Sequence, residues 1–282
     1  MRASPILLMA LLLAAACGST PQPPEPHRLR AALEAESEGA KRYGRGDYAF
    51  AVRRFAEAVR LNASIDNMAG ATRNRLHLAR SELALGRAEA ALDVLATAEP
   101  ESDAGVKLDI LLLKAQAQLA LNRNDAAQQT LASSFVQCAN ACPQVITLHL
   151  LQARAALAAG RAAEALIHAE AALRLLQGKD AAHETGNAWR LVAAARLATN
   201  DAAGALAAAH HALDIDRGLA LPEKIARDWL LIGDIRQKAG TGDTAAAYRR
   251  ALDVANAAGM ADIARDAMQS LAQIKKSEKT VR

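Results

Sequence analysis

The hydrophobic and polar positions of this chain follow a helical period over most of its length. In residues 72–85, and again in residues 88–98, the apolar or small side chains fall on one broad face. Apolar residues that recur every three or four positions are typical of amphipathic α-helices. Since no stretch shows the two-residue alternation of a β-strand, the pattern predicts an all-α protein.

One short pattern recurs six times along these predicted helices. A Gly or Asn is followed after five residues by Ala, after four more by a residue that is large in most copies, and after three more by a small one. The copies are Gly46–Ala51–Phe55–Ala58, Gly86–Ala91–Leu95–Ala98, Asn122–Ala127–Leu131–Ser134, Gly160–Ala165–Ala169–Ala172, Asn200–Ala205–Ala209–Ala212 and a slightly compressed one that ends in Tyr248 and Ala251. Such self-similarity predicts a repeat architecture, and repeat folds mostly present binding surfaces.

Each copy begins where one helix must stop and the chain must turn. Gly accepts the left-handed conformation that ends a helix, and Asn is the usual second choice. These residues occupy the predicted turns at Gly46, Gly86, Asn122, Gly160, Asn200 and Gly240. N-cap or first-turn carboxylates for the following helix come from Asp47, Asp125, Asp201 and Asp243. Each unit is therefore predicted to be a helix–turn–helix hairpin.

These hairpins resemble tetratricopeptide repeats. The second-helix half of that motif is matched by Gly46-Asp47-Tyr48 with Ala51, Phe55 and Ala58, and the first-helix positions by Trp189, Val192 and Ala193 and by Trp229, Ile232 and Gly233. The resemblance covers residues 28–275. It implies a right-handed α-solenoid of about six hairpins, closed by a capping helix at Ala261–Ile274 and followed by a basic tail at 276–282.

The repeat spacing departs from that family. The recurring alanines at positions 51, 91, 127, 165 and 205 are separated by 40, 36, 38 and 40 residues, whereas the usual period is about 34. We expect longer helices or longer loops between hairpins to absorb the surplus.

The first 16 residues have the pattern of a secretory signal. Arg2 precedes an apolar run, Ile6–Ala16, which is shorter than the roughly 20 residues that a membrane-spanning helix needs. A Cys directly after three Ala resembles the lipobox of bacterial lipoproteins, which implies cleavage after residue 16 and lipidation of Cys17. Ordinary signal cleavage with an unlipidated Cys17, or a cytosolic regulator without a signal, are the alternatives.

Residues 17–27 are predicted to form a tether. Four prolines lie among residues 21–26, which favours an extended polyproline II chain of about 3.1 Å per residue. By resemblance to Gram-negative lipoproteins, Gly18 after the Cys implies sorting to the outer membrane, with the solenoid facing the periplasm.

The charge of the chain is nearly balanced. The whole sequence has 34 Lys and Arg against 30 acidic residues, and loss of Arg2 with the signal leaves a net charge of +3 (33 minus 30). Basic residues are interleaved with acidic ones, and only 3% of the residues are aromatic. We therefore expect no nucleic-acid binding.

After Cys17, the remaining cysteines are Cys138 and Cys142, which lie between the third and fourth hairpins. In an exported protein, such a close pair predicts a disulfide. Free thiols are an alternative, and so is a metal site with His149, although that site would lack a fourth ligand.

No constellation of catalytic residues is evident. The seven histidines include no His-Glu-x-x-His motif, and the sequence has no Gly-x-Ser-x-Gly elbow. We therefore expect a protein that is not an enzyme and that needs no cofactor and no metal. A hydrolase or binding protein of the envelope, with a site built across several repeats, remains the alternative.

The resemblance implies that the first helices of the hairpins line a concave groove. On that basis Arg73, His77 and Arg80 form one stripe at i, i+4 and i+7. The further predicted groove residues are Gln116, Arg154 and Arg190. Arg side chains could hold the carboxylates of an acidic peptide or protein tail. The alternative is that these arginines are solvated or pair with carboxylates of the chain itself, such as Glu82.

Together these features predict a membrane-anchored adaptor or scaffold that binds protein or peptide partners. Lipoproteins that resemble it serve pilus, secretion or cell-wall machinery, and the resemblance implies that range of functions.

Overall fold

The computed structural model describes residues 26–98, 103–138 and 142–280. The predicted signal peptide, Cys17 and most of the tether lie outside these residues. The described chain is all helical. Its helices are α2 (His27–Gly44), α3 (Tyr48–Ala63), α4 (Met68–Ala84), α5 (Ala88–Ala96), α6 (Ala104–Ala120), α7 (Asn124–Cys138), α8 (Val145–Ala158), α9 (Ala162–Leu176), α10 (Ala182–Ala198), α11 (Ala202–Gly218), α12 (Pro222–Ala239), α13 (Thr244–Ala257) and α14 (Ala261–Thr280).

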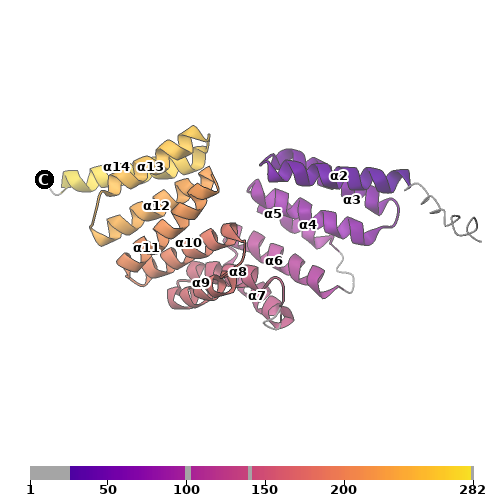
Figure 1. Cartoon of the computed structure of the whole chain (residues 1–282), viewed down its shortest axis with the longest axis horizontal. Helices are drawn as coiled ribbons and strands as arrows, with labels where there is room; N and C mark the ends of the chain where they lie inside the picture. Colours follow the sequence, from indigo (N-terminus) through magenta and orange to yellow (C-terminus); the bar gives the residue numbers. More distant parts are fainter. Residues whose placement is uncertain (1–25, 99–102, 139–141, 281–282) are drawn as a thin grey trace, which may run out of the picture.

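The helices form six consecutive hairpins and a final helix, as the sequence predicts. Each helix packs against the next one along the chain, and each even-numbered helix also contacts the next even-numbered helix. The even-numbered helices therefore form one layer of the solenoid and the odd-numbered ones, α3 to α13, the other. Figure 1 shows the hairpins following an arc, with α2 and α3 at one end, α13 and α14 at the other, and α7–α9 at its lowest part.

The six predicted turn residues all adopt the left-handed backbone conformation. Their φ angles lie between 56° at Asn122 and 80° at Gly46. The side chains of Asp47, Asp201 and Asp243 accept hydrogen bonds from backbone N–H groups in the first turn of the next helix. The local signals therefore place all six turns correctly.

Small residues allow the paired helices to approach closely. The recurring alanines at positions 51, 91, 127, 165 and 205 are all fully buried. Gly233 of α12 lies against the ring of Tyr248 in α13, so closely that an added Cβ would be 2.4 Å from Cε1 of that ring. Gly39 of α2 and Phe55 of α3 make the equivalent contact in the first hairpin.

Helix length absorbs the surplus in the repeat period. Helices α10 and α11 have 17 residues each, so the two helices alone fill the roughly 34 residues of an ordinary unit. At the C-terminus, α14 continues to Thr280, beyond the predicted boundary at Ile274. Residues 276–280, predicted as part of a separate basic tail, therefore continue the capping helix. Basic residues are favourable at the C-terminal end of a helix, where the dipole is negative.

A disulfide joins the third hairpin to the fourth. Cys138 ends α7, Cys142 precedes α8, and their Cα atoms are 5.0 Å apart. Cys138 also packs into a buried cluster with Leu131 and Leu148. Both sulfur atoms are used in this bond, so neither is a thiol that could bind zinc.

Candidate functional site

Two adjacent cavities lie between the N-terminal even-numbered helices. The first, of about 350 Å³, is lined by Ala69, Thr72, Arg73, Leu76, His77, Arg80, Asp103, Val106 and Asp109. The second, of about 340 Å³, is lined by Tyr43, Arg80, Leu83, Ala84, Asp109, Leu112, Leu113, Gln116, Gln144 and Thr147. Because Arg80 and Asp109 line both cavities, we call the two together the α4–α6 groove. It contains four of the predicted groove residues, Arg73, His77, Arg80 and Gln116.

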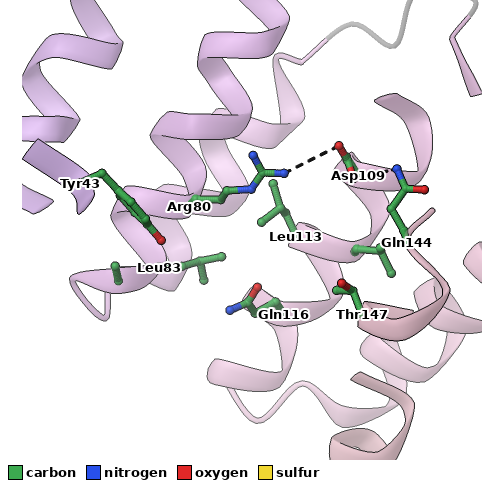
Figure 2. A pocket seen from close by; sticks show the side chains of 10 residues that line it. Tyr43, Arg80, Leu83, Asp109, Leu113, Gln116, Gln144 and Thr147 are labelled. Carbon is green, nitrogen blue, oxygen red and sulfur yellow. Dashed lines mark hydrogen bonds and ion pairs between the residues drawn. The ribbon is translucent and has the colours of Figure 1, made fainter. Parts of the chain in front are cut away.

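Arg80 and Asp109 separate the two cavities. The guanidinium of Arg80 on α4 lies 3.7 Å from Oδ2 of Asp109 on α6, and Figure 2 shows the two side chains pointing toward each other. The amide of Gln144 donates a hydrogen bond of 3.2 Å to the other oxygen, Oδ1 of Asp109. Both partners of the ion pair are partly exposed, so a bound molecule could contact either of them.

Arg73 is held by the chain itself. Its Nε and Nη2 atoms donate to the two carboxylate oxygens of Glu36 on α2, over 2.9 and 3.0 Å. Asn74 donates a further hydrogen bond of 2.9 Å to Glu36. Burial alone would raise the pKa of Glu36, but these hydrogen bonds outweigh it and lower the pKa. Arg73 therefore follows the alternative given above, a pair with a carboxylate of the chain itself, while it still lines the first cavity.

His77 and Gln116 contribute neutral surfaces to the groove. The imidazole of His77 stacks on the ring of Phe55 with centroids 5.1 Å apart and an interplanar angle of 18°. Burial, together with the cations of Arg80 and Arg73, lowers the pKa of His77, although Glu36 opposes the shift. Gln116 lines the second cavity together with Tyr43 and Thr147.

Arg190 is also engaged within the chain, contrary to its predicted place in a partner-binding groove. It lies on α10, and its Nε donates to Oδ1 of Asp228 on α12 over 2.6 Å. It also pairs with Asp216 on α11 and donates to Asn187 over 3.0 Å. Both carboxylate side chains are completely buried. A buried carboxylate requires such a partner, and this requirement explains why Arg190 turns inward.

The buried carboxylates share a strongly perturbed environment. Burial raises the pKa of Asp228 to about 7; Arg190 opposes the shift and Asp216 adds to it. This cluster could have been recognised in the sequence by a carboxylate among apolar residues on one helix face. Asp228 precedes Ile232 and Ile235 by four and seven residues on α12, so the three side chains lie on the same buried face.

Arg154 is the predicted groove arginine without an ion-pair partner in the described part of the chain. It lies on α8, outside the α4–α6 groove. Arg154 is exposed to solvent, yet nearby protein atoms partly desolvate its guanidinium, and this desolvation lowers its pKa. The Arg227 cation lowers the pKa further. A carboxylate on a bound molecule would find an available cation here.

His149, considered above only as a possible zinc ligand, and His168, which the sequence analysis does not single out, form a cluster with Phe135. Nδ1 of His149 on α8 lies 3.0 Å from Nδ1 of His168 on α9, and both rings make edge contacts with Phe135 of α7. Burial lowers the pKa of both histidines. Over residues 26–98, 103–138 and 142–280, no group of three or more His, Cys, Asp or Glu residues is arranged to hold a metal ion.

None of the described helices combines the length and the apolar composition that a bilayer span requires.

The fold is similar to that of several solved proteins. A chain of the APC/C hetero-tetramer Cut9–Hcn1 aligns with a TM-score of 0.66 at 15% identity, over 84% of this chain and 42% of its own length. A signal-transduction ATPase with a tetratricopeptide-repeat sensor, PH0952 from Pyrococcus horikoshii, aligns with a TM-score of 0.66 at 15% identity, over 85% and 37%. A Rap protein in complex with competence and sporulation factor aligns with a TM-score of 0.59 at 11% identity, over 92% and 78%.

This chain therefore spans less than half the length of the first two of these proteins. No protein-family model and no curated protein matches the sequence. At such identities the likeness establishes the fold alone. The chain has an all-α helical-repeat solenoid fold, similar to that of tetratricopeptide-repeat proteins, and this confirms the fold class predicted from the sequence.

Proposed function

We propose that this chain is an adaptor that binds a segment of another protein in the α4–α6 groove. The observation that carries the proposal is the pair of adjacent cavities on the layer of even-numbered helices. Helical-repeat solenoids use such extended surfaces for binding. Two proteins of similar fold support the proposal, because they were solved in complexes, the Cut9–Hcn1 hetero-tetramer and the Rap protein with competence and sporulation factor. The proposal treats the chain as a binding protein and assigns it no catalytic residue.

The location belongs to the proposal as well. We propose a lipoprotein anchored through Cys17 to the bacterial outer membrane, facing the periplasm, where it helps to assemble an envelope complex such as a pilus, a secretion system or the cell-wall machinery. The apolar run that precedes Cys17 and the proline-rich segment that follows it support this location. The disulfide between Cys138 and Cys142 is in keeping with an oxidising compartment.

Capture of partners tests the binding function. The full chain would be used to capture proteins from a crosslinked envelope extract, beside a double variant that places charged side chains in the groove. Ala69→Glu and Ala84→Lys suit this purpose, because both residues line the groove, are exposed and lie at the ends of α4. The matched control carries Ala163→Glu and Ala257→Lys at the corresponding ends of α9 and α13, which do not line the groove.

We expect a partner that wild type and the control capture and that the groove variant loses. Equal capture by all three proteins would place the interface elsewhere and refute the groove as the binding site. The location has its own test: metabolic labelling with a fatty acid should modify the wild-type chain and fail on Cys17→Ser. Unlabelled wild-type protein would remove the lipid anchor from the proposal and leave the groove untouched.

A further inference from the structure

We infer that the α4–α6 groove recognises an extended, uncharged peptide segment that carries apolar side chains at positions i and i+2, one for each cavity. This inference rests on the proposed adaptor function and names the chemistry of the partner segment. It follows from the arrangement of the two cavities, from their apolar walls and from the pairing of the charges that line them.

The ion pair between Arg80 and Asp109 fixes the arrangement. Both residues line both cavities, and the atoms that join them are 3.7 Å apart. A ligand that fills both cavities must pass over this pair. In an extended chain, residues i and i+2 point to the same side and are about 6.6 Å apart. That spacing lets two side chains descend on opposite sides of the ion pair while the intervening residue points away.

Each cavity offers an apolar wall for one side chain. In the first cavity the wall is formed by Leu76 and Val106, which belong to one core cluster. In the second it is formed by Leu83, Leu112 and Leu113. Contact with these walls removes apolar surface from water, which is the main driving force for placing an aliphatic side chain there.

The charges around the groove are already paired. Glu36 holds Arg73, and Asp109 holds Arg80. Asp103 accepts a hydrogen bond of 2.7 Å from the Gly105 N–H at the start of α6. The charged residues that line the cavities, Arg73 and Arg80 against Asp103 and Asp109, therefore sum to zero. A charged ligand side chain would compete with one of these partners, whereas a neutral one leaves the pairs intact.

Polar groups at the second cavity suit a peptide backbone. Gln116 and Thr147 lie on neighbouring helices, and Figure 2 shows their side chains near Leu113 and Gln144. An amide and a hydroxyl each offer a donor and an acceptor, which match the N–H and C=O groups of an extended chain. These contacts would hold the main chain without selecting a charged side chain.

A displayed library of random nonapeptides tests the inference directly. The library would be selected on the full wild-type chain and then counter-selected on the variant with Ala69→Glu and Ala84→Lys. We expect enrichment of sequences with aliphatic or aromatic residues at i and i+2 and an uncharged residue between them. Enrichment of acidic peptides, or of apolar peptides without the two-residue spacing, would overturn the inference and leave the adaptor function standing.

Affinities of one enriched peptide, synthesised with a fluorescent label, separate the two cavities. Ala69→Glu blocks the first cavity and Ala84→Lys the second, so each should weaken binding by about tenfold to a hundredfold, the equivalent of one apolar side chain. Replacing residue i or i+2 of the peptide by Ser should weaken binding to wild type by a similar factor. The controls Ala163→Glu and Ala257→Lys should bind as wild type does.

The outcomes are distinct. If one cavity variant weakens binding and the other does not, the two-cavity arrangement is wrong while peptide binding in the groove stands. If neither variant changes the affinity, the peptide binds elsewhere and the inference fails. If the library yields no enrichment at all, both the inference and the binding of peptides by this groove are refuted.

Discussion

The buried carboxyl group of Asp228 should make the protein lose stability as the pH rises, and Asp228→Asn should remove that loss. Asp228 has an ordinary pKa of 3.8, which burial and Asp216 raise to about 7 in the fold against the effect of Arg190. A group with a raised pKa keeps its proton in the folded chain after the unfolded chain has lost it. The free energy of unfolding must therefore fall between about pH 4 and about pH 7.

The magnitude follows from the two pKa values. The interval from 3.8 to about 7 corresponds to about 4 kcal/mol at roughly 1.36 kcal/mol per pH unit. Asn has the shape of the protonated carboxyl group. Its Oδ1 can accept the hydrogen bond from Arg190, and its Nδ2 can donate toward Asp216, whose Oδ1 is buried without a partner. We expect Asp228→Asn to exceed the stability of wild type by about 1.6 kcal/mol near pH 5, which is about 1.2 pH units above 3.8, and by up to about 4 kcal/mol near pH 9.

Urea unfolding followed by circular dichroism, at about pH 5 and about pH 9, measures this difference. Asp253→Asn is the control, because Asp253 is exposed on α13; it should change stability little at either pH. A variant Asp228→Asn that is less stable than wild type by the same amount at both pH values would refute the reasoning. That result would mean that Asp228 is ionised in the fold across the whole range and that its pairing with Arg190 outweighs its burial.

Three further variants test the packing, the backbone and the disulfide. Gly233→Ala should lower the free energy of unfolding by roughly 1–3 kcal/mol, because its Cβ would lie 2.4 Å from the ring of Tyr248; an unchanged melting temperature would contradict the close contact. Ala220→Gly should raise stability by about 0.5–1 kcal/mol, because Ala220 has a φ of 52° that Gly adopts more readily, and a loss in urea unfolding would contradict this. Replacing Cys138 and Cys142 by Ser should lower the free energy of unfolding by about 2 kcal/mol, the chain-entropy value for a five-residue loop. If the variant were unfolded throughout, the disulfide would do more than hold one connection between hairpins.

The hairpins could be predicted from the sequence because their signals are local. A Gly or Asn at the turn, an Asp after it and an Ala five residues beyond the turn lie within a few positions of one another. The structure places Asn122 in the left-handed conformation and buries Ala127 completely. The end of α14 could not be placed in this way, because the basic residues after Ile274 are compatible both with a tail and with the last turns of a helix.

The sequence predicts which positions line the groove. It does not predict which of their side chains already have a partner within the chain. Position along a helix determines that Arg73 faces the neighbouring hairpin, whereas its partner Glu36 lies 37 residues away in the sequence. Arg190 and Asp228 are 38 residues apart, the same separation as Glu36 and Asn74. A search for complementary polar residues about one repeat apart on successive first helices would have found both pairs.

This internal pairing changes what a partner must bring to the groove. The prediction of an acidic ligand assumed that the arginines were free to bind carboxylates. Arg73 and Arg190 instead donate hydrogen bonds to carboxylates of the chain, and Arg80 lies 3.7 Å from the carboxylate of Asp109. A ligand carboxylate at Arg73 or Arg190 would gain one charged hydrogen bond only by breaking another of similar strength. A neutral apolar segment faces no such exchange, because it gains contact with the cavity walls while the ion pairs remain. Selectivity for acidic residues is therefore expected, if anywhere, near Arg154, outside the cavities that select apolar side chains.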